Sequence, residues 1–291
     1  MVRATCLTMT LAVWLGWAAP GSAQDYLDVL VVRVKPDQRA AFDAAARKIA
    51  DASRRHQGDT WVALDTVYGE QGTISMISTR RDFAEIEKGY EVFYAAMHKA
   101  YGAAGTEKIL QDFSASTESS RGEVRRRRWD LSANAPSDPA ALAKRIGESR
   151  WVRTTMISIR PGHVPQFEEQ LRAAKNAVEK NDPTHPVLVS QSAGGQKGMI
   201  FYISWLVKSL SEFDSIPGVP QVLGPEAYQK FLAASAEAVE GSETVISRFV
   251  PEISNPPEAV AAASPDFWNP KPAAPKPKSA EAGKPEGKEK K

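Results

Sequence analysis

Two charged residues lie in otherwise apolar stretches, and they are the first candidates for chemistry. Arg33 is near the end of YLDVLVVRV, and Asp65 lies within TWVALDTVYG. If both side chains face one cavity, they either form a structural ion pair or orient a polar group of a ligand. Trp61, Met156 and Tyr202 share that cavity if the strands alternate as expected below. These five residues are the predicted ligand-binding set.

Other side-chain chemistries have little support. The histidines at positions 56, 98, 163 and 185 have no metal-ligand spacing, which argues against a mononuclear metal site. The single cysteine, Cys6, lies in a predicted leader, so the mature chain would have no thiol for catalysis, disulfides or metal binding. No glycine-rich phosphate loop, nucleophile elbow or metalloprotease helix motif is present. Whether the protein catalyses any reaction stays open.

Residues 1–23 are predicted to be a signal peptide. Arg3 supplies the positive start, residues 7–19 the apolar stretch, and residues 21–23 a small-residue cleavage site. The apolar stretch has about 13 residues, whereas a membrane span needs roughly 20. We therefore expect an exported protein, periplasmic or extracellular, with no transmembrane span once the leader is removed.

The opposite end of the chain is rich in Pro, Lys and Ala. Residues 269–291 carry seven lysines and three glutamates and have no large apolar side chain. We predict that residues 256–291 are disordered. Removing residues 269–291 and Arg3 from the formal charge of +2 leaves about −3 for the folded part, which argues against a nucleic-acid partner. The basic tail could contact anionic envelope surfaces.

The elements that would position the candidates occur twice, 125 residues apart. VKPDQRAAF (34–42) and IRPGHVPQF (159–167) each end a strand at a proline and then start a helix. In each copy the helix has one apolar stripe: Phe42, Ala45, Ala46 and Ile49, then Phe167, Leu171, Ala174 and Val178. Two short strands joined by GEQG, or by GGQKG, predict a hairpin. The constant offset indicates an internal repeat.

Each copy is expected to finish with a helical region and a closing strand. The predicted closing strands are KILQDFSAS (108–116) and TVISRFVPE (244–252). In the second copy the proline-rich residues 216–226 are an insertion, either a lid over one barrel mouth or a longer loop. We interpret RGEVRRRRW (121–129) as a solvated extension that blunts an exposed sheet edge, in preference to a polyanion site. Asp138, Pro139 and Gly147 predict a short helix between the copies.

Strand, helix, hairpin, helix, strand is the βαββαβ order of a ferredoxin-like fold. The strands are apolar on both faces, so the sheet face without helices must be covered, and two copies can cover each other. We therefore predict an α+β fold with two tandem ferredoxin-like repeats, at 24–131 and 151–255, joined by a linker at 132–150 and packed sheet-to-sheet. In element order and in the repeated 34–42 and 159–167 pattern, the chain resembles the dimeric α+β barrel superfamily.

Alternation along each strand assigns side chains either to the helices or to the barrel lumen. The expected lumen set is Val29, Val31, Arg33, Trp61, Ala63, Asp65, Thr154, Met156, Ser158, Ile200, Tyr202 and Ser204. A register error of one residue would exchange the two faces of a strand.

The resemblance spans roughly residues 25–255 and implies a range of activities. Members include cofactor-free antibiotic-biosynthesis monooxygenases, haem-degrading oxygenases and chlorite dismutase-like haem proteins. It implies that His98, on the second predicted helix, is the one candidate haem ligand; otherwise no cofactor is expected. Two hypotheses follow. The protein binds a small apolar ligand or an envelope protein without catalysis, or it is a cofactor-free monooxygenase or haem-using enzyme of this superfamily.

Overall fold

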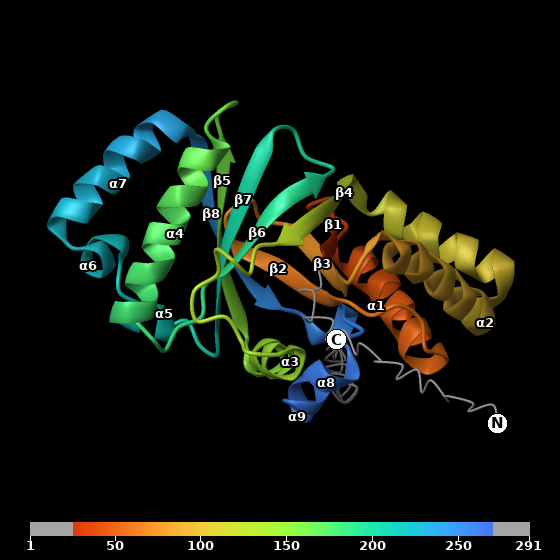
Figure 1. Cartoon of the computed structure of the whole chain (residues 1–291). Coiled ribbons are helices and arrows are strands. Elements are labelled where there is room, and N and C mark those ends of the chain that lie inside the picture. The colour runs from red at the N-terminus through yellow and green to blue at the C-terminus, as the bar shows by residue number, and fades with distance from the viewer. Residues whose placement is uncertain (1–25, 270–291) are drawn as a thin grey trace, which may run out of the picture.

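Eight strands form a closed antiparallel barrel in the computed structural model, which describes residues 26–269 (Figure 1). The strand order around the barrel is β1-β3-β2-β8-β5-β7-β6-β4. The predicted signal peptide and residues 270–291 of the predicted tail lie outside the described residues.

The two halves of the chain repeat one order of elements. The first half contains β1 (Tyr26–Val34), α1 (Arg39–His56), β2 (Val62–Tyr68), β3 (Thr73–Arg80), α2 (Phe83–Ala115) and β4 (Thr117–Arg127). After α3 (Pro139–Glu148), the second contains β5 (Trp151–Ile159), α4 (Val164–Asn181), β6 (Leu188–Gly194), β7 (Met199–Val207), α5 (Glu212–Ser215), α6 (Val219–Leu223), α7 (Pro225–Ala238) and β8 (Val239–Phe249). The ferredoxin-like order and the α+β fold class are therefore confirmed.

The barrel closes because the outer strands of each half pair with the other half. Strand β2 pairs with β8, with Leu64 opposite Phe249, and β4 pairs with β6, with Arg127 opposite Ser190. This pairing removes the edges of both sheets. The interpretation of residues 121–129 as an exposed, charged sheet edge is therefore wrong, since most of them form β4 inside the closed barrel.

The first predicted closing strand is also wrong. Residues 108–115 continue α2, which bends at Gly102 (φ 67°), and β4 begins only at Thr117. Helical spacing places Ile109 and Phe113 on the side of α2 that faces α1. There the ring centroids of Phe113 and Phe42 are 4.9 Å apart. Strands β4 and β8 consequently correspond at an offset of 122 residues at both ends, rather than at the offset inferred from matching Phe113 to Phe249.

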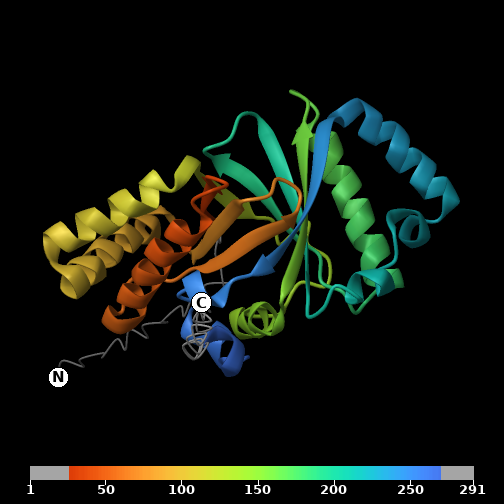
Figure 2. The same ribbon diagram turned by 180° about the vertical axis from the view of Figure 1, so that it is seen from behind.

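The helices cover the outside of the barrel in two groups, with α1 and α2 on one half and α4, α6 and α7 on the other (Figure 2). The predicted stripe of α1 is buried as expected, and in α4 Phe167 and Leu171 are buried. Residues 216–226 include α6, which packs on α4, and none of them lines the barrel cavity described below. They therefore do not form a lid over it.

One end of the barrel is closed by α3 and by the segment after β8, which contains η1 (Pro251–Ile253), α8 (Glu258–Ala262) and α9 (Pro265–Trp268) (Figure 1). The predicted α3 is confirmed, with Asp138 accepting a hydrogen bond from the Ala141 amide at 2.8 Å. Trp268 is fully buried and donates from Nε1 to the Gly147 carbonyl at 2.9 Å. The predicted start of the disordered tail, at residue 256, is therefore too early, because residues 256–269 fold against one end of the barrel.

Among residues 26–269, no helix has the length and apolar character needed to cross a membrane.

Candidate functional site

The barrel encloses a cavity of about 610 Å³, a size suited to one small molecule. Its floor is apolar and lies above α3 and the C-terminal segment. Floor residues belong to the cluster around Trp268 and include Leu64, Val152, Leu188, Leu206 and Phe249. Every one of the eight strands contributes lining residues, so closure of the barrel creates the cavity.

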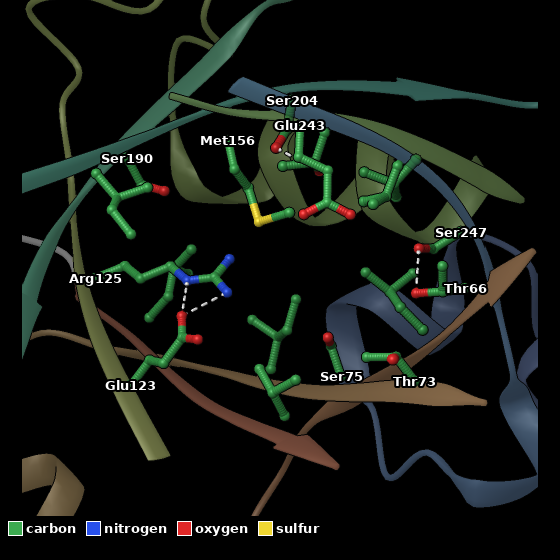
Figure 3. Close-up of a pocket in the computed structure, with 18 of the residues that line it drawn as sticks. Thr66, Thr73, Ser75, Glu123, Arg125, Met156, Ser190, Ser204, Glu243 and Ser247 are labelled. Atoms are coloured by element: carbon green, nitrogen blue, oxygen red, sulfur yellow. Dashed lines mark hydrogen bonds and ion pairs between the residues drawn. The ribbon is translucent and has the colours of Figure 1, made fainter. Parts of the chain in front are cut away.

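Polar side chains line the middle and the mouth of the cavity. Figure 3 shows them pointing inward from around the barrel. Two hydrogen bonds join hydroxyl groups of neighbouring strands. Thr66 binds Ser247 at 3.3 Å, and Thr154 binds Ser204 at 3.0 Å. Each pair retains hydrogen-bonding capacity for a ligand, because a hydroxyl can both donate and accept. The remaining hydroxyl residues are Thr73, Ser75, Ser158, Ser190 and Ser242.

One wall of the cavity carries a buried carboxylate held by arginines. Glu123 of β4 has a side chain only 1% exposed. Arg121 donates from Nε and Nη2 to its Oε1 atom at 2.9 and 2.7 Å. Arg125 donates from the same two groups to Oε2, at 2.9 and 2.7 Å. Two side chains from β7 and its preceding turn complete the group, since Gln196 binds Oε1 and the Tyr202 hydroxyl donates to Oε2 at 3.0 Å.

The electrostatics of this cluster favour a charged Glu123. Burial alone would raise the pKa of the Glu123 carboxyl, but Arg125 and Arg121 hold that pKa below its usual range. Burial, together with the adjacent Glu123 carboxylate, raises the pKa of Tyr202 to about 12. Tyr202 is therefore a neutral hydrogen-bond donor at neutral pH, and Arg125 lies over its ring with 3.7 Å between the guanidinium carbon and the ring centroid.

The facing wall has a different charge. Glu243 of β8 points into the cavity beside Met156 of β5, opposite Arg125 (Figure 3). It is exposed at the mouth, and no described residue forms an ion pair or hydrogen bond with its carboxylate. The cavity therefore has a cationic wall on β4 and an isolated carboxylate on β8.

Several predicted lumen residues do face the cavity. Met156 lines it, as do Val31, Thr154, Ser158, Ile200 and Ser204. Tyr202 lies on the same face of β7 as Ile200 and Ser204, and its side chain contacts the glutamate of the cationic wall. Whether Met156 and Tyr202 bind a ligand stays a prediction. The alternation did predict correctly which face of β5 and which face of β7 point into the lumen.

On β2 the predicted face is wrong by one residue. Val62, Leu64 and Thr66 line the cavity, whereas Trp61 and Ala63 belong to the core beneath α1. Asp65 likewise lies outside the lumen, where Arg39 of α1 donates to it at 2.9 Å and Arg248 at 3.4 Å. Both faces of β2 are buried, so the hydrophobic pattern did not distinguish them.

Arg33 and Asp65 do not pair. Arg33 lies near the mouth and pairs with Glu70 and with Glu118, the latter at 3.0 Å. Its side chain is 38% exposed, and it is not among the residues that line the cavity. The predicted charged couple is therefore two separate ion-pair groups, with Asp65 outside the lumen and Arg33 at the rim of the mouth.

His98, the candidate haem ligand, lies away from the barrel cavity. It is exposed on α2, with its ring 6.3 Å from that of Tyr94. None of the histidines, which all lie within residues 26–269, lines the barrel cavity. Within residues 26–269 no cluster of His, Cys, Asp and Glu is arranged to hold a metal ion. The expectation that the protein needs no cofactor stays a prediction.

The sequence contains a signal for the charged wall, in the residues that the sequence analysis interprets as a solvated sheet edge. At the start of RGEVRRRRW the charged Arg121, Glu123 and Arg125 alternate with Gly122 and Val124, which is the period of one strand face. Arg121, Glu123, Arg125 and Arg127 all line the cavity. Recognising β4 as a central strand would have assigned them to the lumen.

No protein-family model matches the chain, and no curated protein matches it in sequence. Solved structures match over most of its length. An anthrone oxidase-like protein is 14% identical, with 78% of this chain and 92% of that chain covered and a TM-score of 0.51. A haem-binding protein from Thermus thermophilus is 11% identical, with coverages of 79% and 93% and a TM-score of 0.46. Chlorite dismutase from Candidatus Nitrospira defluvii, in complex with imidazole, is 8% identical, with coverages of 84% and 96% and a TM-score of 0.47.

Identities this low bear on the fold alone, and the strand order is independent evidence for it. The chain therefore has the dimeric α+β barrel fold, with both ferredoxin-like halves supplied by one polypeptide.

Proposed function

We propose that this protein is an exported carrier or receptor that binds one small, largely apolar molecule in the barrel lumen. The observation that carries the proposal is the cavity of about 610 Å³ with a closed apolar floor and a polar mouth. Concave sites of this kind, with a few convergent polar groups, are the usual form of small-molecule sites. Export is supported by the composition of residues 1–23.

The enzyme alternative has weaker support. Some proteins of similar fold are described as an anthrone oxidase-like protein or as haem-binding, but the likeness to them concerns the fold. The described residues that line the lumen include no histidine, and His98 is exposed on the outer helix α2. Binding without a bound haem is therefore the function that the described residues favour.

The proposal is tested by filling the lumen from one strand. Thr154 faces the cavity, whereas its neighbour Thr155 binds Thr244 on the outer face of the same strand at 2.9 Å. Protein purified from its native compartment is examined by native mass spectrometry for a retained small molecule. We expect retention in the unchanged protein and in Thr155→Phe, and loss in Thr154→Phe. Equal retention in both variants would show that the molecule binds elsewhere.

A further inference from the structure

The cavity has an uneven distribution of charge that specifies its ligand more closely. Three arginines and three glutamates line it, so the lining is balanced as a whole. On β4, however, Arg121 and Arg125 both pair with the single carboxylate of Glu123. These three side chains therefore carry a local excess of one positive charge at neutral pH. Glu70 offsets little of that excess, because it pairs with Arg33 at the rim.

The arginines of this wall retain donors for a ligand. Arg121 and Arg125 each contact Glu123 through Nε and Nη2. The Nη1 groups, with two N–H donors each, are not used on Glu123. A second acceptor can therefore bind to either guanidinium without displacing the buried carboxylate, which is how arginine commonly recognises oxyanions.

The Arg125 guanidinium is also held in place before a ligand arrives. Its side chain is 12% exposed, and it lies between Glu123 and the ring of Tyr202. Tyr202 is itself held by its hydrogen bond to Glu123. A fixed guanidinium loses little conformational entropy on binding, so its hydrogen bonds contribute more to affinity. Arg121, with a side chain 53% exposed, is closer to the solvent at the mouth.

The facing wall restricts where an anion can bind. Glu243 projects toward the same space from β8, with no cation paired to it among residues 26–269 (Figure 3). A ligand carboxylate near Glu243 would be repelled, whereas on the β4 wall it would be attracted. The two walls therefore favour one orientation of an acidic ligand, with its apolar part toward the floor.

From this geometry we propose that the lumen selects an amphipathic organic anion, a small acid whose carboxylate binds Arg125 and Arg121 while its apolar body contacts the floor. This inference rests on the proposed function, since it requires that the lumen bind a small molecule. It adds a ligand class and two specificity-determining residues.

The test compares two probes of equal shape that differ in charge, 2-naphthoate and 2-naphthamide. Calorimetric titration of the unchanged protein should give a dissociation constant about tenfold or more lower for the naphthoate, which is the usual size of a charge-assisted hydrogen bond. Arg125→Met should bring the two constants within about threefold of each other. The matched control is Arg126→Met, on the opposite face of the same strand, where Arg126 binds Gln191 at 3.2 Å; it should keep the preference.

A second variant keeps the test decisive if Arg125→Met unfolds. Glu243→Gln removes the repelling carboxylate and leaves the arginine cluster intact. It should tighten naphthoate binding about two- to fivefold, as for a partly exposed charge pair, and leave naphthamide binding unchanged. A purely structural role for the arginines would not produce this opposite change.

The outcomes separate this inference from the proposed function. If both probes bind equally and Thr154→Phe abolishes both, the lumen binds small molecules but does not select anions, and the inference is overturned while the proposed function stands. If neither probe binds the unchanged protein, the inference is overturned, whereas the proposed function is decided by whether native mass spectrometry finds a retained molecule that Thr154→Phe loses. If the naphthoate preference survives in Arg125→Met and is unchanged in Glu243→Gln, the anion binds elsewhere.

Discussion

At the scale of single residues, Glu123 is held by contacts on both of its carboxylate oxygens. Its carboxylate is buried, and four side chains donate to it: Arg121, Arg125, Gln196 and Tyr202. A buried charge is tolerated only when it is paired and hydrogen-bonded. Removing one partner of such a pair costs more than the pair contributes, because the other charge remains buried.

We therefore expect Glu123→Gln to lower the free energy of unfolding by about 3 kcal/mol at pH 7, as measured by urea denaturation. The matched control is Glu118→Gln on the same strand. Glu118 pairs with Arg33, but its side chain is 52% exposed, so its loss should cost about 0.5 kcal/mol or less. Equal costs for the two variants would contradict the importance of burial at Glu123.

The same residue predicts a pH dependence with a definite sign. The pKa of Glu123 is lower in the folded protein than its usual value, which in unfolded chains is about 4.3. Its contribution to stability is therefore fully present above about pH 4.3 and is lost as pH falls through the depressed folded pKa. The stability gap between the unchanged protein and Glu123→Gln should narrow between pH 5 and about pH 2. A gap that stays constant over this range would contradict a charged Glu123.

At the scale of elements, the sequence was informative where one face of a strand differed from the other. Strand β5 alternates polar Thr154 and Ser158 with apolar Ile157 and Ile159, and its lumen face was predicted correctly. Strand β2 is buried on both faces, so nothing in its pattern separated Trp61 from Val62. In β4, the charged sequence alone indicates a solvated edge, because the pairing of β4 with β6 is a long-range contact that no local pattern reveals.

The β6–β7 turn shows how a glycine can serve such a long-range contact. Gly195 has a φ of +78°, and a Cβ placed there would lie 2.0 Å from the Gly122 carbonyl oxygen of β4. Gly198, in the same turn, has a φ of +70° but no atom within 4 Å of such a Cβ. Both positions require a left-handed backbone, but only Gly195 lies against a neighbouring strand.

These two glycines allow conformational strain to be separated from contact. Gly198→Ala should cost about 1 to 2 kcal/mol of unfolding free energy, the usual cost of a left-handed alanine. Gly195→Ala should cost more than that, because the β6–β7 turn must also move away from β4 and from Glu123, which Gln196 of the same turn binds. Thermal unfolding of both variants measures the difference. Equal shifts in Tm would show that the turn moves away from β4 without cost.

At the scale of the whole molecule, the C-terminal segment links both halves of the barrel to the floor. The Trp61 indole donates to the Ile253 carbonyl at 2.8 Å, and Arg54 of α1 donates to the Pro251 carbonyl at 2.8 Å. Farther along, Trp268 packs on Phe249, with 5.5 Å between ring centroids. The segment that composition assigned to a disordered tail therefore completes the core, because a few aromatic residues outweigh the surrounding Pro and Ala.

This arrangement predicts that one tryptophan near the end of the chain stabilises the entire barrel. Trp268→Ala should lower the free energy of unfolding by about 3 to 5 kcal/mol, as expected for a fully buried indole. Phe267→Ala, one residue away, removes a half-buried ring stacked on Arg150 at 3.8 Å and should cost about 1 kcal/mol. The two halves share the β2–β8 and β4–β6 strand pairings as well as the floor. Urea unfolding of Trp268→Ala should therefore remain a single transition by fluorescence and by circular dichroism. Two separate transitions would mean that the floor stabilises only its own half, and that the lumen can open without unfolding of the barrel.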